Sequence, residues 1–283
     1  NTKIYSLNEN GDLTYPYEAL DGQTQTLKEI FEGTHNLSEQ IINSKKPMII
    51  FGESFLRLTS AELLFDKTID FLNNKNKFST DWNPLNILSC DAASVGNFDL
   101  GLINQERDLL NELKSHRFEL VYFLGQDNIN FNKKDEFIIY QGSHGDKGAE
   151  FADIILPGSA YTEQNGCFTN LEGKLQKAYK ASYPPGEAKE DWQIINEIAE
   201  IMNNRKLFND KDELESSMFN FLNLQKEKQS KEYKNKFTGE FKNEKLKIDI
   251  KPYYFSNIIA RCSKTMIECN ISKLNLKSTG TEG

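Results

Sequence analysis

The residues best suited to chemistry lie together in the turn Gly142–Gly148, which contains three glycines, His144 and Asp146. Backbone amides in a glycine-rich turn can hold a phosphate. A histidine beside a carboxylate can act as a general base when a substrate lies within hydrogen-bond reach. No G-x-G-x-x-G or Walker-type sequence is present, so a nucleotide site has little support. We expect His144 and Asp146 to stabilise the turn by hydrogen bonds. The glycines should supply backbone freedom where the strand passes into the loop without side-chain clash.

Two further carboxylates, Asp153 and Glu163, could form an acid–base pair, and His35 and His116 complete the set of histidines. We expect Asp153 to anchor backbone at the start of a strand and Glu163 to lie in the first turn of a helix. The two histidines fall in loops or at helix ends. No serine–histidine–acid or cysteine–histidine arrangement stands out. The sequence therefore predicts no catalytic residue.

The four cysteines, Cys90, Cys167, Cys262 and Cys269, include no C-x-x-C pair. Ligands of a four-thiolate cluster converge on one site and usually include closely spaced cysteines, so we predict no metal site. The irregular spacing in a chain of this length also disfavours a disulfide scaffold. Cys262 and Cys269 fall seven residues apart on an expected helix and would share a face, where they suit the role of small buried apolar residues.

The elements that would position these residues alternate between strands and helices. Expected strands are apolar runs at 47–51, 85–88, 119–125, 137–140 and 152–156. Expected helices begin at Ser60 and Glu190, and a third spans 103–113. The pattern predicts an α/β fold with a mostly parallel sheet flanked by helices. The turn Gly142–Gly148 then lies at the carboxyl edge of the sheet, where such folds bind ligands, and Ile155 lies in a strand covered on both faces.

Changes in composition along the chain suggest four parts. Residues 1–44 carry scattered apolar side chains in a polar background and read as an N-terminal extension that packs on a partner chain. Residues 45–205 form the α/β domain. Residues 206–251 are rich in Lys, Glu, Asn and Gln, as expected of a charged connector, and residues 252–283 form a C-terminal helical tail.

Composition excludes several classes of function. The 283 residues carry a formal net charge of −8, which gives no electrostatic footprint for nucleic acid or an anionic membrane surface. No run approaches the roughly 18 apolar residues needed to span a bilayer. We therefore expect neither a nucleic-acid partner nor direct membrane insertion.

Several motifs keep a common order along the chain. The run Ala152–Pro157, followed by Glu163, Asn170, Glu172 and Gly173, resembles the molybdopterin oxidoreductase superfamily. Within it, His144–Ala149 and Pro184–Trp192 resemble the large iron–sulfur subunits of mitochondrial-type respiratory NADH:ubiquinone oxidoreductase, or complex I. Weaker similarities lie at 12–15, 45–48 and 253–266.

The resemblance implies a partial molybdopterin oxidoreductase-like fold. In catalytic members a pterin cofactor lies across the region of 152–173, whereas the complex I subunit has lost the metal cofactor in most lineages. We therefore expect a non-catalytic structural part of the peripheral arm, on the matrix side of the mitochondrial inner membrane. No cofactor is expected in this chain. The NADH-to-ubiquinone electron transfer would run through iron–sulfur clusters on a partner chain that carries the N-terminal part of the same subunit, with other peripheral-arm subunits as further partners. The alternative is a fragment of a molybdopterin-dependent oxidoreductase, or a domain that binds a pterin nucleotide.

Overall fold

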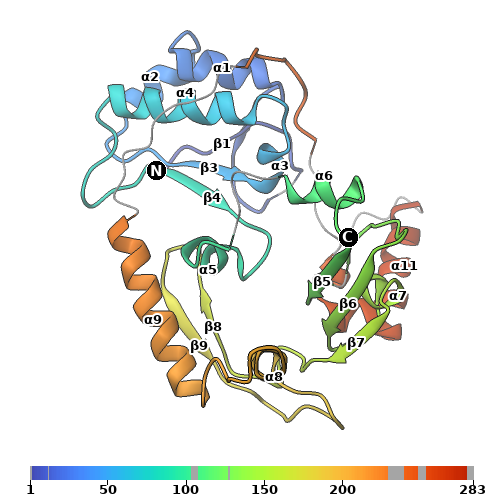
Figure 1. The fold of residues 1–283 in the computed structure, drawn as a ribbon. Coiled ribbons are helices and arrows are strands. Elements are labelled where there is room, and N and C mark those ends of the chain that lie inside the picture. The colour runs from blue at the N-terminus through green and yellow to red at the C-terminus, as the bar shows by residue number, and fades with distance from the viewer. Residues whose placement is uncertain are drawn as a thin grey trace. The chain divides into compact units, whose positions relative to one another are not determined.

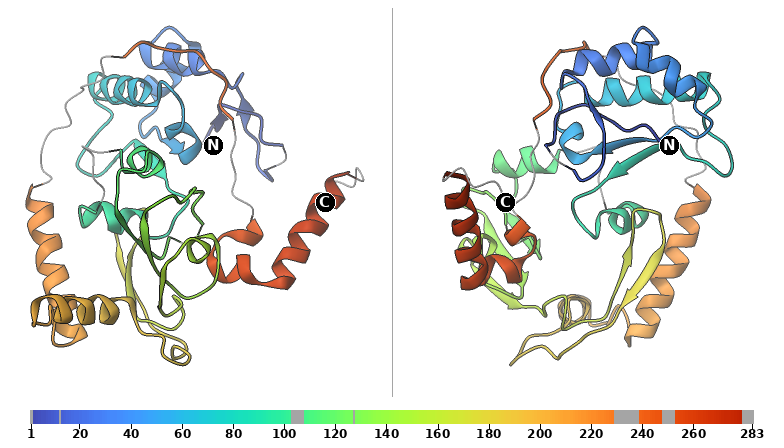
Figure 2. Two further views of the ribbon diagram at one scale, coloured as in Figure 1. Left: turned by 45° about the vertical axis from the view of Figure 1, so that its right-hand side comes forward. Right: turned by 180° about the vertical axis from the view of Figure 1, so that it is seen from behind.

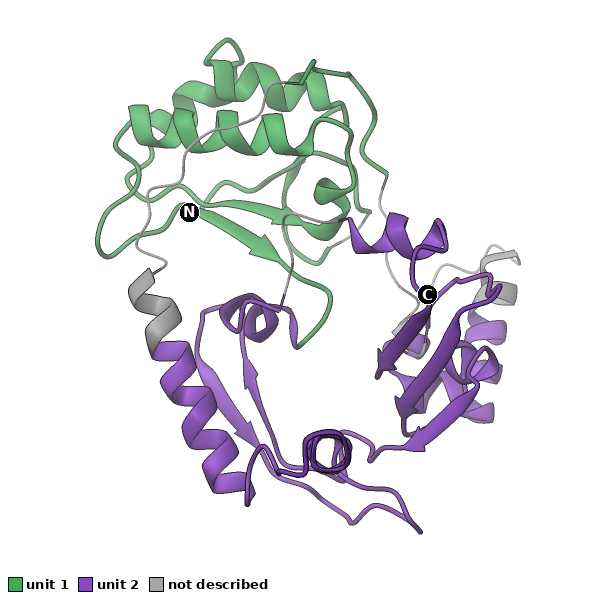
Figure 3. Cartoon of the chain, in the orientation of Figure 1, with its two compact units in different colours: residues 1–92, 231–249 green, residues 93–230, 250–283 purple. Residues whose placement is uncertain are grey.

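The chain divides into two compact units, each built from segments distant in sequence (Figures 1 and 3). Unit 1 comprises residues 1–92 and 231–249, and unit 2 comprises 93–230 and 250–283. The computed structural model describes residues 2–11, 13–102, 108–126, 128–228, 239–247 and 253–278. Asp12, the first part of the expected helix 103–113, and portions of the connector and the tail lie outside the described residues.

Unit 1 combines two short parallel strand pairs with helices. The strands are β1 (Tyr5–Ser6) paired with β2 (Glu18–Ala19), and β3 (Ile49–Gly52) paired with β4 (Leu85–Leu88). The helices are α1 (Thr24–Glu32), α2 (Asn36–Asn43), α3 (Glu53–Leu56) and α4 (Ala61–Asn74). Helices α1, α2 and α4 lie together on one side of β3 and β4 (Figure 1). The helix expected after Ser60 is therefore confirmed as α4.

The core of unit 1 is aromatic and aliphatic. The rings of Phe51 and Phe55 stack with centroids 3.9 Å apart, and Phe31 meets Phe51 and Phe71 edge-on. Such offset and edge-on pairs add to the free energy gained by burying the rings. Leu72 on α4 is fully buried, because the apolar positions of α4 recur with a helical period on the face that meets the other helices.

Part of the segment 1–44 belongs to this core, and its packing on a partner chain stays an expectation. Ile30, Phe31 and Leu37 are buried in the same cluster as Phe51. The stretch 239–247, expected to lie in the connector, also joins unit 1. There the Glu244 carbonyl accepts from the Thr24 amide at 3.0 Å. The observed units thus differ from the boundaries 45–205 and 206–251.

Unit 2 contains a parallel sheet, a hairpin and several helices. Its strands are β5 (Leu120–Leu124), β6 (Phe137–Gly142), β7 (Ile154–Pro157), β8 (Gly166–Thr169) and β9 (Leu175–Ala178). Its helices are α5 (Ser94–Asp99), α6 (Leu109–Lys114), α7 (Lys147–Glu150), α8 (Asp191–Asn203), α9 (Lys211–Lys228), the 3-10 turn Tyr253–Phe255, α10 (Ile258–Cys262) and α11 (Lys264–Ser278). The order in the parallel sheet is β5-β6-β7, and β8 pairs antiparallel with β9.

All five expected strands exist and all pair in parallel, which confirms the α/β fold class. They form two separate sheets rather than one, with β3-β4 in unit 1 and β5-β6-β7 in unit 2. In the second sheet, Phe123, Ile138 and Tyr140 are buried on one face. Ile155, expected in a strand covered on both faces, is 55% exposed because β7 is an edge strand.

Helix α9 lies beside the β8–β9 hairpin in both views of Figure 2. Lys177 of β9 pairs with Glu215 of α9 at 2.6 Å, and its ammonium lies 5.8 Å from the centre of the Phe219 ring. In the tail, Ser263 ends α10 before α11 begins. Cys262 and Cys269 therefore lie on different helices and do not share the face expected of one continuous helix. Across the described residues, each helix is too short or too polar to cross a bilayer.

Candidate functional site

The glycine-rich turn leaves the carboxyl end of β6 and folds around the buried Tyr140 ring. A Cβ atom added to Gly148 would lie 2.6 Å from the Gln126 carbonyl oxygen and 2.8 Å from that ring. A Cβ on Gly142 would also collide with Tyr140. The glycines of this turn do not adopt the left-handed conformation. Gly142 and Gly148 are therefore needed because a side chain would clash there, as expected, although neither uses the left-handed conformation.

His144 and Asp146 lie in the turn but have different partners. The His144 ring nitrogen Nδ1 lies 2.9 Å from Ser143 Oγ, and the Tyr140 hydroxyl donates to the His144 carbonyl at 3.2 Å. The Asp146 carboxylate accepts from the Lys147 amide at 2.8 Å. These bonds confirm that both residues stabilise the turn itself.

Helix α10 of the C-terminal tail docks on this turn through Arg261, a residue that the sequence analysis did not single out. Arg261 Nε donates to Asp146 Oδ2 at 2.9 Å, and the two side chains are 18% and 19% exposed. Cys262 Sγ donates to the Gly145 carbonyl at 3.2 Å. Arg261 is the one arginine in 252–283, and the planar, permanently charged guanidinium is well suited to such a contact. A single arginine in an otherwise lysine-containing tail was the signal in the sequence that could have pointed to this contact.

A buried polar network joins the sheet to the start of α8. The Tyr122 hydroxyl donates to the Gln141 side-chain oxygen, and Gln141 Nε2 donates to Asp191 Oδ1 at 2.7 Å. Gln164 adds a donor to Asp191 Oδ2 at 3.3 Å. Burial, with a smaller effect from the negative charge of Asp191, raises the pKa of Tyr122. Since Gln141 is fully buried, it needs these partners to offset the loss of water.

Glu190 is the centre of a second network at the same helix end. Its carboxylate accepts from Lys211 Nζ at 2.5 Å and from Trp192 Nε1 at 3.1 Å, and Lys180 Nζ lies 3.7 Å away. Glu190 and Gln193 also form a capping box on α8, which confirms the helix expected to begin here. Burial opposes ionisation, but the hydrogen bonds from Lys211 and Trp192 and the nearby lysine charges lower the pKa of Glu190.

Asp153 and Glu163 do not form an acid–base pair. Asp153 accepts from the Ile138 amide at 2.7 Å and from Lys133 Nζ at 2.6 Å, which confirms its role as a backbone anchor. The hydrogen bond from Lys133 and that from the Ile138 amide lower the pKa of Asp153. Glu163 accepts from the Ala160 amide at 3.0 Å. Residues around Glu163 form a turn, one of the two elements expected there, so the placement of Glu163 in the first turn of a helix is wrong.

The motif residues Asn170, Glu172 and Gly173 build the β8–β9 hairpin turn. Asn170 Oδ1 accepts from the amides of Glu172 and Lys174 at 3.0 and 2.9 Å. Gly173 adopts φ of +76°, where a glycine avoids the strain of a side chain. The hairpin was not predicted, although a glycine turn between short alternating runs is a recognisable signal.

The remaining histidines have local structural partners. His35 Nδ1 accepts from the Leu37 amide at the start of α2 at 3.1 Å, and His116 pairs with Glu136. The hydrogen bond from the Lys134 amide, with a further one from His116, lowers the pKa of Glu136.

Cys90 follows β4, and the other three cysteines lie in β8, α10 and α11. All four lie in the described part of the chain, where none forms a disulfide. Burial raises the pKa of the Cys167 thiol in β8. Within the described ranges, no three His, Cys, Asp or Glu side chains gather in a way that could hold a metal.

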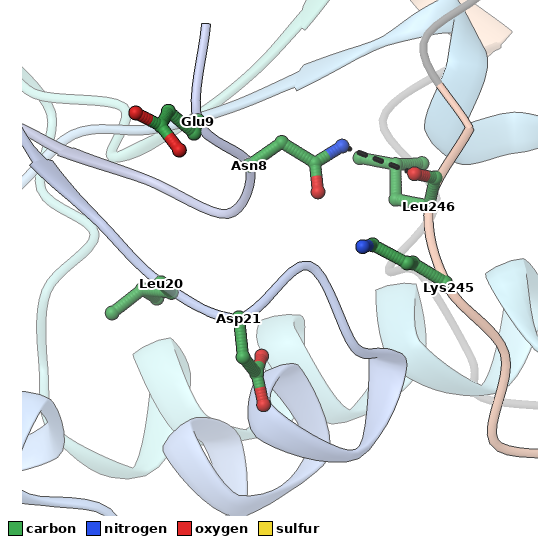
Figure 4. A pocket seen from close by; sticks show the side chains of 6 residues that line it. All are labelled: Asn8, Glu9, Leu20, Asp21, Lys245 and Leu246. Atoms are coloured by element: carbon green, nitrogen blue, oxygen red, sulfur yellow. Dashed lines mark hydrogen bonds between the residues drawn. The ribbon is translucent and has the colours of Figure 1, made fainter.

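Unit 1 carries an open depression of about 400 Å³ (Figure 4). It is lined by Asn8, Glu9, Leu20, Asp21, Lys245 and Leu246. Asn8 Nδ2 donates to the Leu246 carbonyl at 3.0 Å across one side of it. The Asp21 carboxylate already accepts from the Thr26 hydroxyl and the Gln23 amide. The depression thus follows the line where 245–246 joins the N-terminal segment, and its polar groups mainly hold that segment in place.

A pterin nucleotide fits poorly at the carboxyl edge of β6 and β7. Its pyrophosphate would need several donors, yet the Lys147 amide, Arg261 and Lys211 already bond to carboxylates. Asp146 and Asp191 would instead place negative charge there. Among the described groups of this edge, Ser159 Oγ is buried without a hydrogen-bond partner, and one hydroxyl cannot hold a pyrophosphate.

Comparison with known proteins identifies the family. Residues 1–201 match the family model of molybdopterin oxidoreductases. The chain is 36% identical over 286 residues to the NADH-ubiquinone oxidoreductase 75 kDa subunit of Reclinomonas americana, covering 97% of this chain and 41% of that protein. It is 34% identical to a subunit of the NADH-quinone oxidoreductase of Rickettsia bellii, covering 98% of this chain and 41% of the relative. It is 33% identical to the mitochondrial NADH-ubiquinone oxidoreductase 78 kDa subunit of Candida albicans, covering 95% of this chain and 39% of that protein.

All three relatives are named as subunits of an NADH-ubiquinone or NADH-quinone oxidoreductase, and the match to each runs over nearly all of this chain. The chain spans about two fifths of their length. The parallel sheets agree with the family model, and the motif residues occupy defined structural positions in unit 2. The chain therefore belongs to the molybdopterin oxidoreductase family.

Proposed function

We propose that the chain is a non-catalytic structural part of the large subunit of respiratory complex I. In this role it supports electron transfer from NADH to ubiquinone, while the iron–sulfur clusters are held by another polypeptide. The assignment to this complex is supported by the names of the relatives, which are subunits of NADH-ubiquinone or NADH-quinone oxidoreductases. The scattered cysteines support the location of the clusters outside this chain.

One observation carries the non-catalytic part of the proposal. The glycine-rich turn Gly142–Gly148, the candidate cradle for a pterin pyrophosphate, is closed by internal bonds, with Asp146 held by Arg261 and by the Lys147 amide. A cofactor site needs donors that are available to the ligand. Here those donors stabilise the turn and attach α10 to it.

The location and partners follow from the same proposal. Relatives from Reclinomonas and Candida are NADH-ubiquinone oxidoreductase subunits, and the Candida protein is named mitochondrial. We place the chain in the matrix-side peripheral arm at the mitochondrial inner membrane. Its partners are the cluster-bearing polypeptide, expected from the sequence to be a separate chain, and other peripheral-arm subunits.

The alternative function is the binding of a pterin nucleotide, as in the family's catalytic members. The buried, unpartnered Ser159 Oγ favours it, since an orphaned hydroxyl near the carboxyl edge could bond to a ligand. It remains the weaker candidate because the charged groups around it are acidic or already paired.

Affinity purification of the native assembly through a tag on this chain tests both functions. We expect the subunits of complex I in stoichiometric amounts, with NADH oxidation that depends on their clusters. The preparation should contain no molybdenum or tungsten and no pterin fluorescence after denaturation. Stoichiometric pterin would favour the alternative. Failure to recover complex I subunits would overturn the proposed function.

A further inference from the structure

The second face of the β5-β6-β7 sheet carries apolar side chains that are partly open to solvent, while Gln141 on the same face is fully buried and bonds to Asp191 at the start of α8. Register places the same-side neighbours in three rows across the strands. The rows are Leu120 with Phe137, then Tyr122 with Ile139 and Ile154, and then Leu124 with Gln141 and Leu156. In this face, Leu120, Leu124, Phe137 and Ile154 are between 43% and 57% exposed. We call it the outer face of the sheet.

The described residues of the sheet's connections that join a core pack on the opposite face. The link from β5 to β6 contributes Ile129 and Phe131 to the opposite face, and the link from β6 to β7 contributes Ala149 and Phe151 there as well. Leu113, which precedes β5, packs on that face too. Parallel sheets occur almost only with both faces covered. The covering layer on the outer face must therefore come from polypeptide other than these connections.

The chemistry of the outer face selects an apolar partner. Its two polar side chains, Tyr122 and Gln141, bond to each other, and Gln141 also bonds to Asp191. The hydrogen bonds that these two side chains need are thus made within the chain. Three strands about 4.8 Å apart and four to six residues long form a surface roughly 10 Å by 15 Å. This is the footprint of one amphipathic helix of about ten residues.

We infer that the outer face is the docking surface for an amphipathic helix from the part of the complex I large subunit that lies outside the matched region. This inference rests on the proposed function and identifies the surface through which the chain would contact the rest of that subunit. The Reclinomonas relative is matched over 41% of its length, so about three fifths of such a subunit is available to supply the helix. A parallel sheet with one face left partly open calls for such a layer.

A cross-linking experiment on the tagged native assembly tests the inference. Benzoylphenylalanine replaces Leu124 in one variant and Leu171 in the control, because Leu171 is 52% exposed but lies in the β8–β9 turn. After irradiation, we expect the probe at 124 to cross-link to a helical peptide of the cluster-bearing polypeptide. The control probe should not label that peptide. A cross-link to a second copy, to another segment of this chain or to an unrelated protein overturns the inference, and so does the absence of any cross-link.

A matched pair of charge substitutions provides a second readout. Ile154→Glu should lower recovery of the cluster-bearing polypeptide at least about tenfold, since it places an unpaired charge in an apolar interface. Leu171→Glu should leave recovery unchanged. Both variants alter exposed side chains, so the isolated chains should show the same thermal midpoint as the unmodified chain. Recovery of complex I subunits with a cross-link elsewhere would overturn only the docking surface. Loss of complex I subunits from the unmodified preparation would overturn the proposed function.

Discussion

The ion pair between Asp146 and Arg261 determines what the glycine-rich turn does. Without Arg261, the Asp146 carboxylate would face solvent at the carboxyl edge of a parallel sheet. With it, the turn becomes an attachment point for α10. A permanently charged guanidinium bonded to a carboxylate and shielded from most of the solvent gives a stronger contact than a fully exposed pair.

A double-mutant cycle measures this attachment. We expect Asp146→Asn and Arg261→Gln to show a coupling of about 1 kcal/mol in the free energy of unfolding, because the pair is mostly shielded. The control pair, Lys189 and Glu197, is 46% and 52% exposed and should show a coupling of about 0.3 kcal/mol. Equal couplings in the two cycles would contradict a special role for the Asp146 contact.

Glu190 makes the stability of unit 2 depend on pH. Its folded pKa lies below the ordinary value of 4.5, so its ion pair with Lys211 stabilises the fold fully above pH 4.5. That stabilisation is lost as the pH falls through the lowered folded pKa. Glu190→Gln should therefore cost about 1–3 kcal/mol at pH 7, and this cost should shrink below pH 4.5. Denaturant midpoints from pH 7 to pH 3 measure the effect. Glu197→Gln, which removes an exposed ion pair, should change the unfolding free energy little at any of these pH values.

At the scale of elements, the turn and the edge strand show how packing changes the meaning of a sequence pattern. Glycines 145 and 148 look equivalent in the sequence. Gly148 touches the Gln126 carbonyl and the Tyr140 ring, whereas Gly145 faces open space. Ile138 and Ile155 both lie in apolar strands, yet one is in the central strand and the other at the edge.

The two glycines can be compared directly. Gly148→Ala should cost about 1–3 kcal/mol of unfolding free energy, because its methyl group would overlap a backbone oxygen that cannot move aside cheaply. Gly145→Ala should stay within about 0.5 kcal/mol of the unmodified chain. Chemical denaturation of the two variants gives the values. A larger effect at Gly145 would mean that the backbone conformation, rather than close approach, requires glycine in this turn.

The two isoleucines form a second matched comparison. Ile138→Ala should cost about 2–5 kcal/mol through lost burial and a cavity, because Ile138 is fully buried. Ile155→Ala should cost less than about 1 kcal/mol, since its side chain is more than half exposed. Denaturant unfolding of the isolated chain measures both. A cost at Ile155 as large as that at Ile138 would show that the edge strand is covered in solution.

At the scale of the whole molecule, the chain is two units whose cores are assembled from distant segments. Unit 1 takes Thr24 from the first helix and Glu244 from a stretch more than two hundred residues later. Unit 2 likewise joins the turn that contains Asp146 to Arg261 of the tail. Residues 231–249 are thus assigned to unit 1, although segments of unit 2 precede and follow them in the sequence.

The distribution of cysteines over the molecule predicts its metal content. Cys90 belongs to unit 1, while Cys167, Cys262 and Cys269 belong to three different elements of unit 2. A four-thiolate cluster needs ligands that converge, so the purified chain should contain no stoichiometric iron. Iron analysis and visible absorbance of the isolated chain test this. One cluster per chain would place part of the electron path in this polypeptide.

Local pattern determined the elements that depend on nearby residues. Apolar runs bounded by turn residues identified all five parallel strands, and acidic residues before an apolar helical period identified α8. The roles of Asp153 as a backbone anchor and of His144 as a turn residue also followed from the sequence. These features are short-range, because strand and helix periods and capping bonds involve residues a few positions apart.

Only the tertiary structure decided features that join distant segments. The division of the strands into two sheets, the burial of Ile30 and Phe31 with Phe51, and the docking of Arg261 on Asp146 each depend on long-range packing. The exposure of Ile155 depends on strand order, which an apolar run does not specify, since interior and edge strands can share one composition. For the same reason, the partly open outer face of the sheet became visible only once the connections were seen to cover the opposite side.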